Sequence, residues 1–500
     1  MSVICRNPAT ASSWFLASLG LLAFLAGFAA LRLTVDVPAD GPYRAMMAYT
    51  WLQNPYAAKC GTWLPAPTYL NGLFLLVVPD PLVSTRIFNL ILGSATVPIY
   101  YLLAKCVFGR SVAAVSAIML LVLPLRIGLS ASSLTESGFL FELVTGIWLL
   151  IVAADTEPPR KLPLIGSLAF LVLAGMTRYE AWLLIPVFPA FFFIRTRQLG
   201  LSSIIALVLL TFPLLWMAGN HYCFDDALKG FRAATSEERY AEAVGLSGGV
   251  TVLGTRMLQQ MGIVLPFFIL VGVWHQGIRL WRRTDLQPER ILYLTLTVIV
   301  WAVLLKFVMA RGPGSFQTRY MLLAMVLALP FAVLPFQTVL APCRAVVGLA
   351  CLFAVTELAA GRGVAATWMP DLWLVQKRPG DAVDSMAELA AWIASSPYRD
   401  RALLTTPLKV DEGWAANYLP LYLPALSGRI RTLSYWLRDE DIAEFVEQHR
   451  PVLLATGDAD IDREELMRAT RLLGARLAID HPVHESSSGL PVRLYRIDER

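Results

Sequence analysis

Charged side chains stand at the ends of long apolar segments in this 500-residue sequence, where they could take part in catalysis. Asp36 and Asp40 follow the first apolar segment, and Glu136 precedes a later one. Arg178 and Glu180 occupy a short turn between two others. A carboxylate can act as a general base, and cations can stabilise a leaving phosphate. These residue types therefore fit the transfer of a group from a phosphate.

Two more cations belong to the same pattern. Arg319 follows a loop that contains Gly-Pro-Gly, and Lys306 lies within the apolar segment before that loop. A cation buried in a bilayer is costly and usually has an anionic partner. Because the guanidinium group matches the geometry of phosphate, a lipid phosphate is one partner that we expect for these cations.

Each of the candidate residues also has a purely structural interpretation. Asp40 could cap a helix that the proline two positions later starts. Glu136 could close a capping box with the serine three positions before it. Arg178 and Glu180 could form a pair whose long side chains reach the membrane surface. Spacing alone does not decide between these interpretations and a catalytic one.

The elements that must position these residues are membrane helices. Hydrophobic residue types make up 56% of the sequence and charged types only 16%, whereas a soluble protein carries about 25% charged residues. This composition excludes a wholly soluble protein, a disordered chain and a coiled coil. The net charge of +5 is too small to indicate nucleic-acid binding. The six cysteines show no spacing typical of a zinc site.

Eleven apolar segments are predicted to cross the membrane, since a spanning helix needs about 20 residues. They are residues 14–33, 87–105, 111–128, 137–154, 162–177, 181–195, 200–219, 257–278, 291–310, 320–336 and 338–358. Tyr69–Val78 is apolar but too short to span, so we expect an interfacial or re-entrant helix there. Lys and Arg collect in cytoplasmic loops, and their positions place four stretches outside the membrane: 34–86, 129–136, 219–256 and 311–319.

The C-terminal part has a different composition. Residues 371–500 contain 37 of the 79 charged residues, which indicates a soluble domain after a membrane domain at 1–370. Three segments of this part have helical periodicity, and four short ones alternate like strands. The helices are predicted at 381–396, 439–449 and 461–473, and the strands at 402–405, 452–455, 475–480 and 492–497. We therefore expect an α-helical polytopic membrane protein with a small extracytoplasmic α/β domain.

Four stretches resemble motifs of the GT-C glycosyltransferases, the class that includes protein O-mannosyltransferases and the bacterial aminoarabinose transferase. They are Asp40–Tyr43, the run from Arg86 to Arg110, Thr177–Trp182 and Arg319-Tyr320. The resemblance covers about residues 14–330. It implies a polyprenyl-phosphate-linked sugar donor and transfer on the outer membrane face with inversion at the anomeric carbon. The acceptor would be a lipid, a glycan or a protein.

The resemblance also implies roles for individual residues. The first-loop carboxylate of the class is the general base, which corresponds to Asp40, but many members carry a second acidic residue where this sequence has Gly41, so Asp36 remains a rival. Donor-phosphate contacts would come from Arg178, Arg319 and Lys306. Acceptor-side or orienting groups would be Glu136, Glu180, Tyr43 and Trp63. No metal is predicted, because the outer loops lack a DxD motif, although some relatives use a divalent cation.

Other readings and details remain open at this point. A polytopic transporter or lipid flippase is the alternative function, but it would predict repeats and mid-span charges; a non-catalytic assembly or export protein is a third. Cys60 and Cys223 both fall outside the membrane and could form a disulfide in an oxidising compartment. The expected location is the bacterial inner membrane, with the C-terminal domain in the periplasm.

Overall fold

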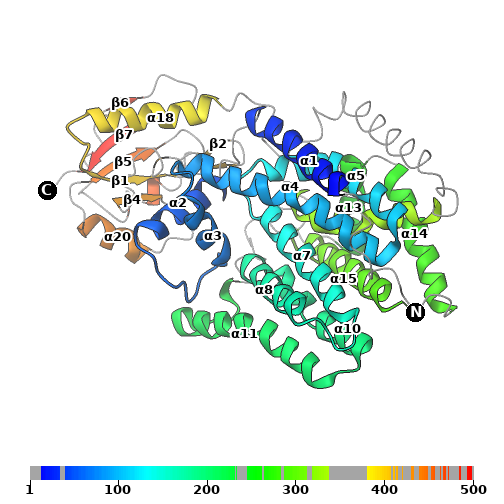
Figure 1. The fold of residues 1–500 in the computed structure, drawn as a ribbon. Helices are drawn as coiled ribbons and strands as arrows, with labels where there is room; N and C mark the ends of the chain where they lie inside the picture. Colours follow the sequence, from blue (N-terminus) through cyan, green and yellow to red (C-terminus); the bar gives the residue numbers. More distant parts are fainter. Residues whose placement is uncertain are drawn as a thin grey trace.

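The computed structural model describes residues 13–33, 40–230, 232, 245–261, 264–282, 287–311 and 318–336, then 380–406 and shorter stretches between 409 and 497. Helices make up most of the described chain before residue 337 (Figure 1). Strands occur in the described residues only after residue 401. The division into a helical part and a C-terminal part that contains strands follows the predicted change in composition.

Six helical segments of the described residues are long and apolar enough to cross a membrane. Five are single helices: α1 (Ser13–Leu33), α4 (Pro81–Phe108), α7 (Glu136–Ala154), α11 (Leu199–Phe224) and α15 (Pro288–Arg311). The sixth runs through η2 (Thr318–Met321), α16 (Leu322–Val333) and η3 (Leu334–Phe336). The protein is therefore an integral membrane protein.

Other predicted spans are bent, short or divided. The helices α5 (Arg110–Val122) and α6 (Pro124–Ser130) meet at a bend of 59° and could together form a seventh span. The predicted span at 162–177 corresponds to the shorter helix α8 (Lys161–Thr177). The one at 181–195 is divided at Pro186 into α9 (Glu180–Leu184) and α10 (Val187–Thr196). The helices α13 (Leu246–Met261) and α14 (Val264–Trp281) follow α11. Because 338–358 lies outside the described residues, the count of eleven stays a prediction.

The loop after α1, which is predicted to lie outside the membrane and which we call the first outer loop, contains two short helices among its described residues: α2 (Asp40–Gln53) and α3 (Ala66–Phe74). α3 has nine residues, which is far below the length needed to span. Leu73 and, just beyond α3, Leu76 and Val77 are exposed on the protein surface. This arrangement agrees with the predicted interfacial helix. α2 packs on α3 and on α4, so the loop is folded onto the helical part.

The antiparallel pair α7 and α8 determines where the charged groups meet. α7 packs along α8 and along α4. Because a short connection joins the end of α7 to the start of α8, the first residue of α7 and the residue after α8 lie at the same end of the pair. The opposite end holds a separate ion-pair group, in which Arg195 contacts Asp155 at 3.3 Å and Glu289 at 3.0 Å. This group links the ends of α7, α10 and α15.

The described C-terminal residues include a five-stranded sheet in the order β4-β1-β5-β7-β6. β1 is parallel to β4 and β5, whereas β7 is antiparallel to β5 and β6. The strands are β1 (Ala402–Thr405), β4 (Ile430–Thr432), β5 (Val452–Thr456), β6 (His484–Glu485) and β7 (Arg493–Ile497), with a separate pair β2 (Lys409–Val410) and β3 (Gly413–Trp414). Figure 1 shows the sheet toward the end of the molecule where α2 and α3 lie.

Several C-terminal elements lie where the sequence predicts them. The helices α18 (Gly380–Ser395) and α20 (Asp439–Gln448) match two predicted helices, and β1, β5 and β7 match three predicted strands. The predicted helix at 461–473 falls mostly, and the predicted strand at 475–480 wholly, outside the described residues. The extent of the α/β domain over 371–500 therefore stays a prediction.

Candidate active site

The first outer loop and the last described span meet at an ion pair. The Nη2 atom of Arg319, in η2, donates to Oδ2 of Asp40 at 2.5 Å. Asp40 is the first residue of α2, so the helix begins two residues earlier than the proline predicts. The side chains of Asp40 and Arg319 are 23% and 11% exposed. The pair is therefore partly accessible, as a group that meets a substrate must be.

Glu136 connects this pair to a second arginine. Its Oε1 atom accepts from Nη1 of Arg178 at 2.8 Å and lies 3.6 Å from Nε of Arg319. Arg178 also donates from Nε and Nη2 to Oε1 of Glu180, at 3.1 and 2.7 Å. Arg178 and Glu136 are mostly buried, whereas the side chain of Glu180 is 38% exposed. One buried carboxylate thus holds two guanidinium groups close together.

A third arginine lies one helical turn from Asp40. The guanidinium carbon of Arg44 lies 4.3 Å from the centroid of the Trp63 ring, and Trp63 in turn packs on Tyr43 with ring centroids 5.8 Å apart. The Nε atom of Arg44 is buried and has no hydrogen-bond partner in the described structure. Cation–π contact of this kind holds a guanidinium group without neutralising its charge. Arg44 was not predicted as a site residue, although its i,i+4 spacing from Asp40 is a usable signal.

The electrostatics of the site follow from this excess of nearby cations. Burial alone would raise the pKa of Asp40, but Arg319, Arg44 and Arg178 together lower it below its usual value. Burial lowers the pKa of Arg44 to about 10, although Asp40 and Glu136 oppose that effect. Burial would also lower the pKa of Arg178, but Glu180 and Glu136 raise it. At neutral pH, Asp40 is therefore a carboxylate among charged guanidinium groups.

The structure decides between the interpretations that the sequence left open for two residues. Glu136 does not close a capping box: the N-cap of α7 is Thr135, which makes no capping hydrogen bond with its side chain. Arg178 and Glu180 do not form an isolated pair at the surface, because the side chain of Arg178 is only 13% exposed and also contacts Glu136. Both residues were predicted as site residues, and both lie in the cluster.

One other predicted residue, Lys306, is not in this cluster, and another, Asp36, is not among the described residues. Lys306 lies on α15 with an exposed side chain, and no ion pair of the described residues includes it. A helix surface that faces away from the protein in a membrane faces lipid, so the position is poorly placed for a shared site. Asp36 lies outside the described residues, and its role as the rival base stays a prediction.

The cluster does not fit a divalent cation. Among the described residues, no group of three His, Cys, Asp or Glu side chains comes together. Asp40 and Glu136 each face a guanidinium group, whereas Mg²⁺ and Ca²⁺ take several oxygen ligands. The predicted absence of a metal stays a prediction.

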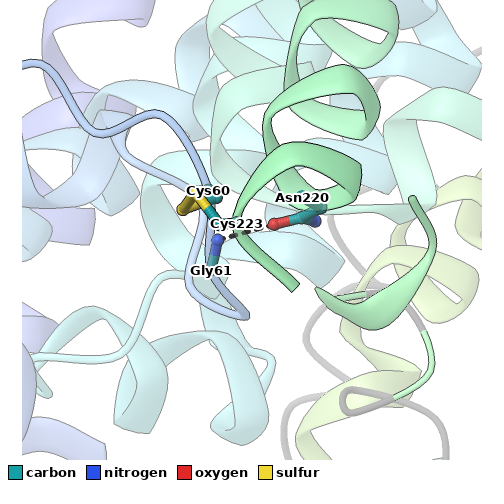
Figure 2. Close-up of a disulfide and its surroundings, with 4 residues drawn as sticks. All are labelled: Cys60, Gly61, Asn220 and Cys223. Carbon is teal, nitrogen blue, oxygen red and sulfur yellow. Dashed lines mark hydrogen bonds between the residues drawn. A yellow bond between two sulfur atoms is a disulfide. The ribbon is translucent and has the colours of Figure 1, made fainter. Parts of the chain in front are cut away.

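A disulfide fixes the first outer loop beside the site. Cys60 is bonded to Cys223, near the end of α11, which is the pairing that the sequence allows (Figure 2). The two residues are 163 positions apart. Disulfides persist in oxidising compartments, so this bond supports the extracytoplasmic position predicted for both segments.

Comparison with known families identifies one segment. Residues 62–221 match a family described as dolichyl-phosphate-mannose-protein mannosyltransferase. This segment is about a third of the chain and carries Glu136, Arg178 and Glu180. No sequence among the curated proteins is significantly similar to the chain.

Solved structures resemble the whole chain. ArnT from Cupriavidus metallidurans, bound to undecaprenyl phosphate, is 12% identical with a TM-score of 0.63, over 97% of this chain and 98% of that one. The oligosaccharyltransferase of Archaeoglobus fulgidus, in complex with zinc and sulfate, is 13% identical with a TM-score of 0.54. That match covers 87% of this chain and 67% of that one. AglB of the same archaeon, in complex with an inhibitory peptide and dolichol-phosphate, is 13% identical with a TM-score of 0.53. That match covers 88% of this chain and 70% of that one. At these identities the likeness shows that the chain shares the fold of ArnT and of the archaeal oligosaccharyltransferase.

Proposed function

We propose that this chain, which has the fold of the GT-C glycosyltransferases, moves a sugar from a polyprenyl-phosphate-linked donor to an acceptor hydroxyl on the outer face of the membrane. The observation that carries this proposal is the cluster of Asp40, Arg319, Glu136 and Arg178. It combines an ionised carboxylate, which can take a proton, with two guanidinium groups, which can hold a phosphate.

The reaction needs one base and one anion-binding group. Asp40 would accept the proton of the acceptor hydroxyl while the hydroxyl oxygen attacks the anomeric carbon. The bond between that carbon and the phosphate oxygen breaks, and polyprenyl phosphate leaves with the electron pair. A single displacement of this kind inverts the anomeric carbon. It requires one carboxylate as base, which is what Asp40 supplies.

Arg319 and Arg178 would hold the leaving phosphate. Guanidinium groups fixed before the reaction stabilise charge that develops in the transition state without a cost of reorganisation. Glu136 fixes both arginines from behind, since it accepts from Arg178 and lies beside Nε of Arg319. Arg319 also donates a hydrogen bond from Nη2 to Asp40. A bound phosphate would compete with Asp40 for that donor.

This competition couples donor binding to the strength of the base. After burial, Arg319 has the largest effect on the pKa of Asp40, and it lowers that pKa. A phosphate that draws the Arg319 guanidinium group away would remove this effect, so the pKa of Asp40 would rise in the donor complex. The carboxylate would thus become a stronger base only when the donor is present.

The surroundings support an extracytoplasmic site and a lipid donor. The disulfide between Cys60 and Cys223 requires an oxidising compartment, which is the periplasm for a bacterial inner-membrane protein. Two similar structures contain undecaprenyl phosphate and dolichol-phosphate, respectively. These lipids support a polyprenyl-phosphate donor. Lipids, glycans and proteins with a hydroxyl group all remain acceptor classes, and the C-terminal domain would cover the same face.

A transfer assay tests this function. Purified protein in liposomes would receive a panel of radiolabelled polyprenyl-phosphate sugars together with membrane extract. Release of label from at least one donor into a glycosylated product, with the anomeric configuration inverted, is the expected result. Folded protein that consumes no donor under any condition would contradict the proposal. Product with a retained configuration would contradict the single displacement.

A further inference from the structure

Four consecutive residues of the first outer loop, Cys60 to Trp63, form a segment that we call the strap. Its first residue is bonded to Cys223. The N–H group of the next residue, Gly61, donates to Oδ1 of Asn220 at 2.7 Å, and Asn220 is buried on the same helix, α11 (Figure 2). Two adjacent positions of the strap are therefore fixed to one helical turn.

Backbone conformation and close packing restrict the strap further. Gly61 has a φ of 135°, which residues with a side chain rarely adopt. On α11, Gly219 leaves room for the backbone carbonyl of Lys59, which a Cβ atom at that position would overlap. Gly219 therefore permits the close approach of the loop to α11, and Gly61 permits the backbone conformation of the strap.

The other end of the strap leads to the catalytic cluster. The carbonyl of Thr62 accepts from the hydroxyl of Tyr179 at 3.1 Å, and Tyr179 follows Arg178 directly. The next residue, Trp63, lies under the guanidinium group of Arg44. The strap thus connects α11 and the Arg178 turn with the arginine that lies one turn from Asp40.

We propose that the strap is a positioning element: by fixing Trp63 to α11 and to Tyr179, it holds Arg44 beside Asp40 and so keeps the base in its reactive position. Asn220, Tyr179 and the disulfide are then positioning residues for transfer, because they act through Trp63 and Arg44 and not on the substrate. The inference rests on the function proposed above, with Asp40 as the general base.

The electrostatics give this role a measurable property that general stability lacks. Arg44 from α2, Arg319 from η2 and Arg178 from the turn after α8 lower the pKa of Asp40, against the effect of burial. Glu136 of α7 faces the same three arginines. If the strap is released, Arg44 loses its ring support and its fixed position. The pKa of Asp40 then rises, and the acidic limb of the rate profile moves to higher pH.

The first test reduces the disulfide in folded wild-type protein. Dithiothreitol gives two electrons and two protons to the sulfurs of Cys60 and Cys223, which become thiols, and is itself oxidised to a cyclic disulfide. The transfer rate would be measured across pH before reduction, after it and after reoxidation. We expect kcat to fall about tenfold, the donor KM to change less than threefold, and the acidic limb to shift upward; reoxidation restores all three.

Variants separate the strap from other effects of a reductant. Cys60→Ser and Cys223→Ser should reproduce the reduced protein and become insensitive to dithiothreitol. Cys106→Ser, which changes a thiol on α4, is the matched control and should behave like wild type. Asn220→Leu removes the acceptor of the Gly61 N–H group and should show the same shift, whereas Asn220→Asp keeps an acceptor oxygen and should recover most of kcat.

The outcomes distinguish this inference from the proposed function. If wild type transfers sugar and the reduced protein keeps both its kcat and its acidic limb, the strap has no positioning role. A fall in rate at every pH with an unshifted limb would show a loss of folded enzyme only and would also overturn the inference. Wild-type protein that transfers no sugar would instead overturn the proposed function, and the inference with it.

Discussion

Arg319 donates to Asp40 at 2.5 Å, although 279 positions separate the two residues in the sequence. The contact joins the first outer loop to the entrance of the last described span, so it depends on the packing of the whole helical part. It also gives Arg319 two roles at different times. In the free protein the guanidinium group neutralises the base, and in the proposed donor complex it neutralises the phosphate.

Replacement of Arg319 tests the second role. Arg319→Gln should raise the donor KM roughly 10- to 100-fold, since a hydrogen bond to a charged group contributes about 1.5–3 kcal/mol. Arg319→Lys keeps the charge but not the fork geometry of the guanidinium group, so its donor KM should lie between those of wild type and Arg319→Gln. Arg197→Gln, at an exposed position beyond α10, is the control. An unchanged donor KM in Arg319→Gln would contradict a phosphate contact.

The pH dependence tests the coupling between donor and base. Arginines depress the pKa of Asp40 in the free protein, so activity is present above that pKa and is lost as the pH falls through it. The acidic limb of kcat/KM reports the free enzyme and that of kcat reports the donor complex. We expect the kcat limb at the higher pH. Coincident limbs would show that the donor leaves the Asp40–Arg319 pair intact.

The two glutamates that contact Arg178 should differ in their effect on stability. Glu136→Gln removes a buried charge that faces two arginines and should destabilise the protein by about 1–3 kcal/mol. Glu180 is 38% exposed, and Glu180→Gln should cost no more than about 1 kcal/mol because solvent screens such pairs. Unfolding in a single detergent would measure both. Equal losses would mean that Glu136 does not organise the cluster.

A pair of glycines on α11 tests how tightly the first outer loop is held. Gly219→Ala places a Cβ atom on the backbone carbonyl of Lys59 and should destabilise the protein by about 1–3 kcal/mol. Gly200→Ala, on the same helix, meets nothing within 4 Å and should be neutral or stabilising by up to about 1 kcal/mol. Thermal unfolding of both variants would show whether the difference has this sign.

Several residues of the candidate site could be predicted because charged side chains are costly inside a bilayer and therefore collect at the ends of apolar segments. Asp40, Glu136, Arg178 and Arg319 each stand where an apolar segment begins or ends, and the topology places those ends on one side. Their mutual pairing was not predictable, because it depends on how each helix is rotated about its axis. Each residue adds about 100° of rotation, and single-sequence patterns do not fix that angle.

Lys306 and Arg44 both show that the direction of a side chain is hard to predict from sequence: Lys306 was predicted as a site residue, and Arg44 was not. Lys306 has the right residue type near the right end of α15, but its side chain is exposed on the outside of the protein. Arg44 received no role from the sequence, although it lies four residues after Asp40 and contacts Trp63. In a nearly all-apolar helix the direction of one cation cannot be inferred from its neighbours, whereas in α2 the i,i+4 spacing could have been used.

The most direct test of the account compares three carboxylate variants in a transfer assay with the active donor. Asp40→Asn should abolish transfer while donor binding persists. Asp225→Asn, which alters an exposed outer carboxylate at the end of α11, should keep wild-type activity. Loss of transfer in Asp36→Asn alone would move the base to Asp36. Full activity in Asp40→Asn would contradict the central claim that this carboxylate takes the acceptor proton.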